Sequence, residues 1–131
     1  MPHKKINPEN WKPAKGYSNA VLSQGSTLNI AGQIGWNENQ EFVAKGFLDQ
    51  MEQTLKNIVT IVETAGGEIP HLTRLTWFVT DKAEYVANQR KVGEIYRKIL
   101  GNHFPAMTMV VVNALVEDEA LIEIEATAII P

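Results

Sequence analysis

The alternation of apolar and polar residues predicts a β-strand over residues 27–34. One face of this segment consists of Leu28, Ile30, Gly32 and Ile34. Val21 and Leu22 come just before it, and residues 24–26 (QGS) predict the turn of a hairpin between the two segments.

Two longer stretches repeat apolar residues at the three- and four-residue spacing of an amphipathic helix. The first stripe is Phe47, Met51, Leu55, Ile58 and Val62. Gly66 and Gly67 are expected to end this helix, because glycine accepts the left-handed conformation beyond a helix C-terminus. The second helix is expected to begin at Asp81, which has Glu84 three residues later as in a capping box, and to end at Gly101.

Three more segments are rich in β-branched and aromatic residues and predict strands at residues 72–80, 107–112 and 121–130. The predicted order is strand, strand, helix, strand, helix, strand, strand. This order favours an α+β fold, in which two helices cover one face of a mixed sheet.

The faces of the predicted strands indicate an oligomer. The last strand is expected to turn Ile122, Ile124 and Ala126 toward the helices and Glu123 and Glu125 away from them. In the segment 72–80, however, Trp77 and Phe78 point to opposite faces, so both faces carry apolar residues. Since two helices cover only one face, we expect the other face to be buried against another subunit.

Composition narrows the class of protein. A chain of 131 residues fits one domain, in which residues 1–15 form an N-terminal arm. The net charge of −3 argues against nucleic acid as the main partner, because phosphate binding needs a basic face. The chain contains no cysteine, which excludes disulfides and thiolate chemistry. We find no signal peptide and no apolar run of membrane-spanning length, and therefore expect a cytoplasmic protein without a membrane partner.

Six segments together resemble the Rid family (reactive intermediate deaminases, also called YjgF proteins). They are residues 16–20 (GYSNA), 31–34 (AGQI), 62–66 (VETAG), 76–81 (TWFVTD), 103–106 (HFPA) and 122–128 (IEIEATA). Each segment is a weak signal by itself, but their order and spacing are specific. The resemblance implies a chorismate-mutase-like fold and a homotrimer, with the sheets packed into a central barrel and ligand clefts between subunits.

The resemblance also implies an activity, the hydrolysis of 2-imino acids to 2-keto acids and ammonia without a metal or organic cofactor. By the same resemblance, Glu123 corresponds to the acidic residue that positions water. Tyr17 corresponds to the tyrosine at the cleft mouth, and Gly32 to a glycine of the pocket wall. The main chain around Met107 corresponds to a segment that lines the cleft.

Met107 departs from the family pattern, in which arginine usually follows Pro-Ala and holds the substrate carboxylate. A methionine has no charge and no hydrogen-bond donor, so the chain lacks charge-assisted bonds worth roughly 1.5–3 kcal/mol each. Arg74 and Arg90 are alternative sources of a cation. Gly93 and Trp36 also differ from the family pattern, and Trp36 is expected to narrow the cleft. These differences favour a larger, more apolar or less acidic ligand.

The remaining candidates have simpler interpretations. Glu125 shares a face with Glu123, but a structural role at the centre of the trimer is favoured over an acid–base pair. His103 is interpreted as structural, because His3, His71 and His103 have no metal-ligand spacing.

Two functions follow from these residues. The first is the hydrolytic deamination of a reactive enamine or imine with non-standard specificity, in which Glu123 orients the water. The alternative is a non-catalytic trimer that binds a small metabolite or regulates a partner enzyme. A ribonuclease is a distant third class, because the chain has no basic, aromatic-lined face.

Overall fold

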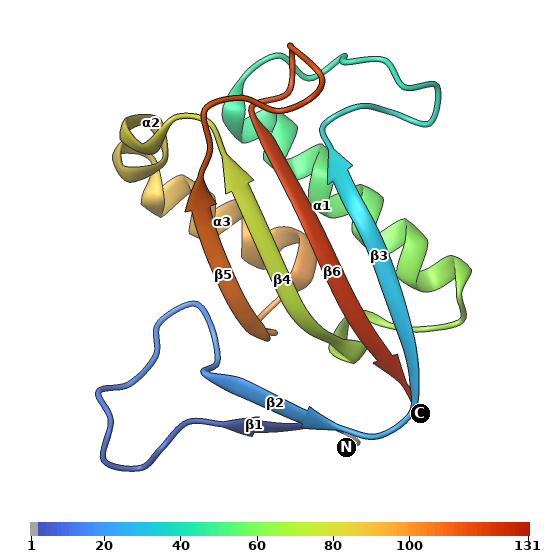
Figure 1. Cartoon of the computed structure of the whole chain (residues 1–131), viewed down its shortest axis with the longest axis vertical. Coiled ribbons are helices and arrows are strands. Elements are labelled where there is room, and N and C mark those ends of the chain that lie inside the picture. Colours follow the sequence, from blue (N-terminus) through green and yellow to red (C-terminus); the bar gives the residue numbers. More distant parts are fainter. Residues whose placement is uncertain (1–2) are drawn as a thin grey trace.

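The computed structural model describes residues 3–131, which form a four-stranded sheet, a separate two-stranded sheet and a layer of helices (Figure 1). The strands are β1 (His3–Ile6), β2 (Ala20–Ser23), β3 (Ser26–Ile34), β4 (Leu72–Val79), β5 (Ala106–Val111) and β6 (Ile122–Ile130). The helices are α1 (Phe47–Thr64), the short 3-10 helix η1 (Ile69–His71), α2 (Lys82–Ala87) and α3 (Gln89–Leu100). None of the helices within residues 3–131 has the length and apolar character needed to cross a membrane.

The larger sheet has the strand order β3–β6–β4–β5. Strand β6 runs antiparallel to both neighbours, whereas β4 and β5 are parallel, so the sheet is mixed as the sequence predicts. A parallel pair needs a crossover connection, and the segment with α2 and α3 supplies it. Helices α1 and α3 pack against each other behind the sheet (Figure 1). The prediction of an α+β fold with helices over one face of a mixed sheet is confirmed.

Helix α1 follows the predicted apolar stripe closely. Its inward residues Met51, Leu55, Ile58 and Val62 are fully buried against the sheet. The helix ends in a Schellman motif, in which the Gly66 N–H donates to the Glu63 carbonyl and the Gly67 N–H to the Val62 carbonyl. Gly66 has a φ of 86°, the left-handed conformation that the prediction required.

The prediction of one continuous second helix was wrong, because this segment forms two helices, α2 and α3. The Asp81 carboxylate accepts a 3.0 Å hydrogen bond from the Glu84 N–H and caps α2, as expected. Helix α2 then stops at Asn88, whose side-chain amide donates to the Glu84 carbonyl. Because such a bond competes with the helical main-chain pattern, the chain turns here before α3 begins at Gln89.

Two predictions about the first strands were also wrong. Residues 21–22 and 27–34 do not form a hairpin with each other, because β2 pairs with β1 in the separate sheet. The alternation of β3 also breaks at a β-bulge between Ile30 and Gln33. A bulge inserts one unpaired residue and reverses the facing of the residues that follow. Gly32 therefore faces away from the helices and Ile30 toward them, although the alternation predicted that the two residues share a face.

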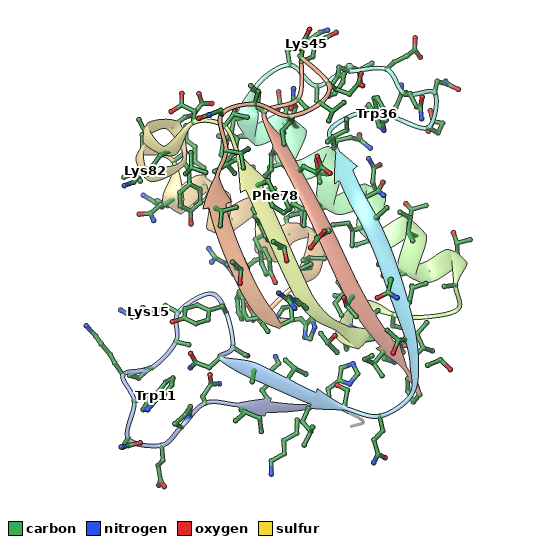
Figure 2. All side chains as sticks on the ribbon, in the orientation of Figure 1. Trp11, Lys15, Trp36, Lys45, Phe78 and Lys82 are labelled. Atoms are coloured by element: carbon green, nitrogen blue, oxygen red, sulfur yellow. The ribbon has the colours of Figure 1, made fainter. Side chains whose placement is uncertain are left out.

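The sheet face without helices is mixed, and less apolar than the sequence suggests. Phe78 lies on this face, which is turned toward the viewer in Figure 2. Its neighbours on β4 and β6 are Thr76, Glu123 and Glu125. We call this surface the open face.

Candidate functional site

Glu123 and Gly32 meet on the open face. A Cβ atom on Gly32 would stand 2.8 Å from Cδ and 3.0 Å from Cγ of Glu123, and its contact with Oε2 would be closer still. Any side chain at position 32 would therefore displace the Glu123 carboxylate. Phe78 and Ile34 are the strand partners of Glu123, so the half-buried carboxylate has apolar neighbours on both sides. Among residues 3–131 it makes no hydrogen bond or ion pair, which leaves both oxygens free for a water molecule.

Met107 lies on the opposite face of the sheet. On β5, Met107 pairs with Leu75 of β4, and its half-buried side chain packs against the core under the helices. Beside it is a cavity of about 390 Å³ between β5 and α3. Its apolar lining includes Met107, Met109 and Trp77, and its polar lining includes Lys15, Gln89 and Arg97. We call this the Met107 cavity.

Three stacked aromatic rings form one wall of the Met107 cavity. The Tyr96 and Phe104 rings are nearly parallel, at 9°, with centroids 5.3 Å apart. Trp77 stacks beyond Tyr96 at 6.3 Å. The Tyr96 hydroxyl donates a 2.6 Å hydrogen bond to the His103 carbonyl, which anchors the stack to the turn before β5. Burial raises the pKa of Tyr96, so its hydroxyl stays protonated as this donor.

Tyr17 is exposed, on the loop that precedes β2. Its position is set by its neighbour Ser18, which is buried. The Ser18 hydroxyl donates a 2.6 Å bond to the Phe104 carbonyl, and its N–H donates a 3.0 Å bond to the Pro105 carbonyl. These bonds hold the Tyr17 loop at the start of β5, near Met107. The role of Ser18 was missed, although it belongs to the segment GYSNA that carries part of the resemblance.

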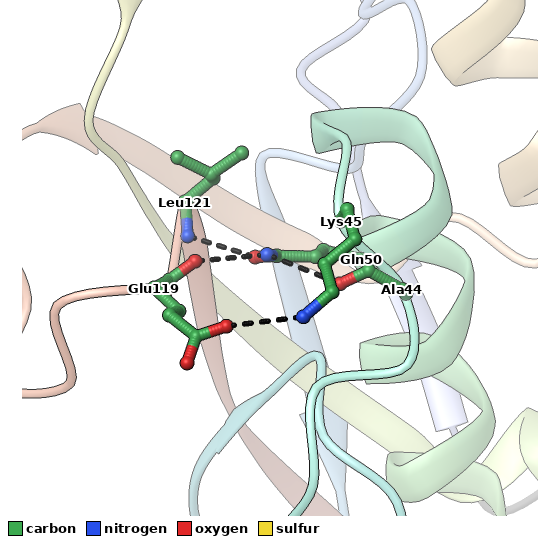
Figure 3. Close-up of polar contacts among 5 residues, drawn as sticks. All are labelled: Ala44, Lys45, Gln50, Glu119 and Leu121. Carbon is green, nitrogen blue, oxygen red and sulfur yellow. Dashed lines mark hydrogen bonds and ion pairs between the residues drawn. The ribbon is translucent and has the colours of Figure 1, made fainter.

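Gln50 fixes the entry to β6, and sequence reasoning missed it as well. The side chain is 1% exposed on the inner face of α1, where it interrupts the apolar stripe. Its Oε1 accepts a 2.8 Å bond from the Leu121 N–H, and its Nε2 donates to the Glu119 carbonyl at 2.9 Å (Figure 3). A weaker bond reaches the Ala44 carbonyl at 3.4 Å. The loop before β6 is thereby tied to α1, two residues before Glu123.

The histidines occupy structural positions in this chain. The His103 Nε2–H donates a 2.7 Å bond to the Leu72 carbonyl. Burial lowers the pKa of His103, more than this bond raises it, so the ring is held in its neutral form. Within residues 3–131 no group of three or more histidine, aspartate or glutamate side chains is arranged to hold a metal ion.

The three arginines near the sheet occupy different surroundings. Arg74 is exposed on β4, where it lines one hollow with Thr76 and Glu125 and a second, of about 510 Å³, that Met107 also lines. Arg90 forms a 3.4 Å ion pair with Glu94 on the surface of α3. Arg97, which sequence reasoning did not single out, is the arginine that lines the Met107 cavity. Its location depends on how α3 packs beside β5, and no local motif signals it.

Two other candidates lie away from the Met107 cavity. Glu125 is exposed on the open face and lines a hollow there with Thr76. Trp36 packs against Phe42 in the loop that follows β3, with ring centroids 5.7 Å apart (Figure 2). The structure therefore pairs Gly32 with Glu123 on the open face and places Met107 on the other side of the sheet, with the Tyr17 loop beside the start of β5.

Comparison with known proteins agrees with this fold. Residues 8–130 match the family described as Endoribonuclease L-PSP. A RutC family protein from Pyrococcus horikoshii is 36% identical over 118 residues, which cover 89% of each chain. The 2-iminobutanoate/2-iminopropanoate deaminase of Homo sapiens is 34% identical over 114 residues, covering 86% of this chain and 79% of the human protein. A solved structure of a protein of unknown function in the Rid family, from Yersinia pestis, has a TM-score of 0.89 and 36% identity, with coverage of 99% of this chain and 100% of that one.

Proposed function

Because this chain belongs to the Rid family, we propose that it hydrolyses a reactive imine or enamine and that Glu123 orients the attacking water. The observation that carries this proposal is the contact between Glu123 and Gly32. A glycine leaves space for the carboxylate, and the carboxylate has no partner among residues 3–131 that would occupy its oxygens. The name of the human relative, an imine deaminase, supports the reaction class.

The reaction needs no cofactor in this scheme. The Glu123 carboxylate accepts a proton from water while the water oxygen bonds to the imine carbon. The imine nitrogen takes up a proton from solvent, and the product of this step is a carbinolamine. Glu123 then gives its proton to the amino nitrogen, the carbon–nitrogen bond breaks to release ammonia, and the hydroxyl proton returns to solvent, which leaves a carbonyl compound and the Glu123 carboxylate. The sum is imine plus water giving ketone plus ammonia, so atoms and charges balance.

The complete site is proposed to form between two copies of the chain. Within one chain, Glu123 and Met107 lie on opposite faces of the same sheet, so one ligand cannot reach both side chains. A second copy placed against the open face would bring its Met107 and Tyr17 loop toward Glu123 and Gly32. Phe78, which is half-buried on that face, would be covered by the same contact. The homotrimer and central barrel implied by the family resemblance are an arrangement that does this.

Met107 sets the specificity in this proposal. Its thioether cannot hold a carboxylate, and its flexible side chain lines an apolar part of the cavity. The substrate is therefore not the usual small 2-imino acid. The same observation favours the second candidate function, a trimer that binds a metabolite and does not turn it over.

Ammonia release from freshly generated 2-iminopropanoate tests the reaction, followed by the same assay on bulkier imines. The wild-type chain is compared with Glu123→Gln, which keeps the shape of the side chain and removes the base. An accelerated reaction that is lost in Glu123→Gln, with an unchanged melting temperature, supports the deaminase. Ammonia release at the spontaneous rate for every imine contradicts it and supports the binding protein.

A further inference from the structure

The Met107 cavity has a charge pattern that distinguishes it from other hollows of the described chain. Its lining contains two cationic side chains, Lys15 and Arg97, and no carboxylate from residues 3–131. Lys15 comes from the loop before β2, to the left of the start of β5 in Figure 2. By contrast, a hollow on the open face contains Glu125 beside Arg74, and another contains residues 117–119 (EDE). A third hollow, which Met107 also lines, contains no carboxylate but only one cation, Arg74. An anion in the Met107 cavity would meet two positive charges and no competing acid.

Arg97 is exposed beside the Met107 cavity, where its guanidinium is available to an anion. A Cβ atom on Gly93 would stand 3.1 Å from Nη1 and 3.8 Å from Cζ of Arg97, so the guanidinium lies over the glycine one turn earlier in α3. Glycine is unfavourable inside a helix, and at this position it leaves space that the guanidinium occupies. Within residues 3–131, Arg97 makes no ion pair or side-chain hydrogen bond, whereas Arg90 on the same helix is paired with Glu94.

The cavity wall also offers an unused hydrogen-bond donor. Trp77 lines the cavity and is 1% exposed, and its Nε1–H has no acceptor among the described residues. A buried donor without a partner is unfavourable, and a ligand oxygen or nitrogen would satisfy it. On the neighbouring strand Met109 is the partner of Trp77, and Met107 is the partner of Leu75, two residues earlier on the same face. Methionine changes rotamer at low cost, so these two side chains can move aside and admit the ligand to Nε1.

From these three features we infer that the Met107 cavity selects a planar aromatic carboxylate that carries a hydrogen-bond acceptor beside its carboxyl group. Arg97 takes the carboxylate, with Lys15 as the second cation. The aromatic ring packs against the wall formed by Phe104, Tyr96 and Trp77, and the acceptor binds the Trp77 Nε1–H. Arg97 thus replaces, from α3, the cation that position 107 lacks. The inference rests on the proposed function, because it assigns the substrate class of the same site. It is tested by ligand binding, which does not require turnover.

Four small probes separate the contacts, each titrated into the full chain by isothermal calorimetry. Phenylpyruvate has the ring, the carboxylate and the keto acceptor. Pyruvate lacks the ring, 3-phenylpropanoate lacks the acceptor, and 1-phenylpropan-2-one lacks the carboxylate. Phenylpyruvate is expected to bind most tightly. Arg97→Gln should weaken phenylpyruvate roughly ten- to a hundred-fold and leave 1-phenylpropan-2-one unchanged, as expected for the loss of a charge-assisted pair.

Arg90→Gln is the matched control. It removes the same charge from the same helix, but Arg90 is paired with Glu94 and does not line the cavity. Its affinity for phenylpyruvate should equal that of the wild type. Equal affinities of Arg97→Gln and Arg90→Gln for phenylpyruvate would overturn the role of Arg97, and so would the absence of binding at millimolar phenylpyruvate.

The Trp77 contact has its own readout, the indole N–H resonance in a ¹H–¹⁵N spectrum. Trp11→Phe and Trp36→Phe identify the other two indole signals, so the buried Trp77 need not be altered. Phenylpyruvate should shift the Trp77 signal downfield, and 3-phenylpropanoate should shift it much less. Equal shifts with both probes would refute the acceptor contact. If phenylpyruvate binding depends on Arg97 but the chain releases no ammonia, the inference is upheld and the deaminase is rejected. If the chain releases ammonia but phenylpyruvate binding does not depend on Arg97, only the inference is rejected.

Discussion

Replacing Gln50 by leucine should lower the stability of the chain by roughly 2–4 kcal/mol. The substitution keeps a side chain of similar volume in α1, and leucine is a good helix former, so packing and helix propensity change little. It removes the acceptor of the Leu121 N–H and the donor to the Glu119 carbonyl. Each of these main-chain groups is then left facing an apolar side chain, at a cost of about 1–3 kcal/mol per group, the carbonyl at the lower end.

The expected change in melting temperature follows from the length of the chain. An unfolding entropy of about 2.1 cal/mol/K per residue gives roughly 0.28 kcal/mol/K for 131 residues, so the loss corresponds to about 7–14 °C. Urea unfolding followed by circular dichroism, at one fixed protein concentration, gives the free energy directly.

Glu119→Ala is the control for this prediction. It removes the Lys45–Glu119 ion pair, which joins the same two segments at 3.4 Å (Figure 3). Both side chains are largely exposed, so the expected loss is below about 0.5 kcal/mol. The main-chain carbonyl of Glu119 keeps its bond to Gln50. If Gln50→Leu and Glu119→Ala destabilise the chain equally, the side-chain amide does not hold the loop before β6 as described.

Three further predictions concern the site. Gly32→Ala should lower ammonia release roughly a hundred-fold, because its Cβ displaces the Glu123 carboxylate, while the flexible carboxylate keeps the change in melting temperature small. Gly46→Ala, whose Cβ would have open space around it, is the control, and equal turnover of the two variants would contradict the placement of Glu123. Met107→Arg should raise turnover of 2-iminopropanoate roughly ten-fold by restoring a cation for the carboxylate, and Met107→Leu should not. An ordered arginine in an intact protein without that gain would show that more than the cation is missing. Because burial lowers the pKa of His103 in the folded chain, the unfolded chain should bind a proton there first when the pH is lowered below about 6.5. The free energy of unfolding should therefore decrease as the pH is lowered, and more steeply in the wild type than in His103→Gln. Parallel curves from pH 7.5 to 5 would disprove this linkage.

Local patterns predicted the elements well where each element buries one continuous face. The stripe on α1 and the alternation in β6 both place their apolar residues in the core as expected. The pattern failed where a single residue changed the local geometry. Asn88 interrupts the second helix, and the bulge in β3 turns Gly32 to the open face. A glycine inside a predicted strand is a known sign of a bulge, and it was the one available signal for this reversal.

The candidate site was only partly predictable. Glu123 and Gly32 were singled out through the family resemblance, and the structure adds that they touch each other. Ser18 and Gln50 were missed because a buried polar residue is recognised by its partners, and those partners lie 86 and 71 positions away in the chain.

The sequence by itself determined the α+β class, the faces of the last strand and of the first long helix, and membership of the Rid family. These features depend on spacings of two to four residues or on motifs that can be read in order along the chain. The tertiary structure alone decided that Glu123 and Met107 lie on opposite faces of one sheet, and that Arg97 lines the cavity beside Met107. Both results depend on strand register and helix packing, in which residues far apart in sequence are brought together and local periodicity carries no information about the partner.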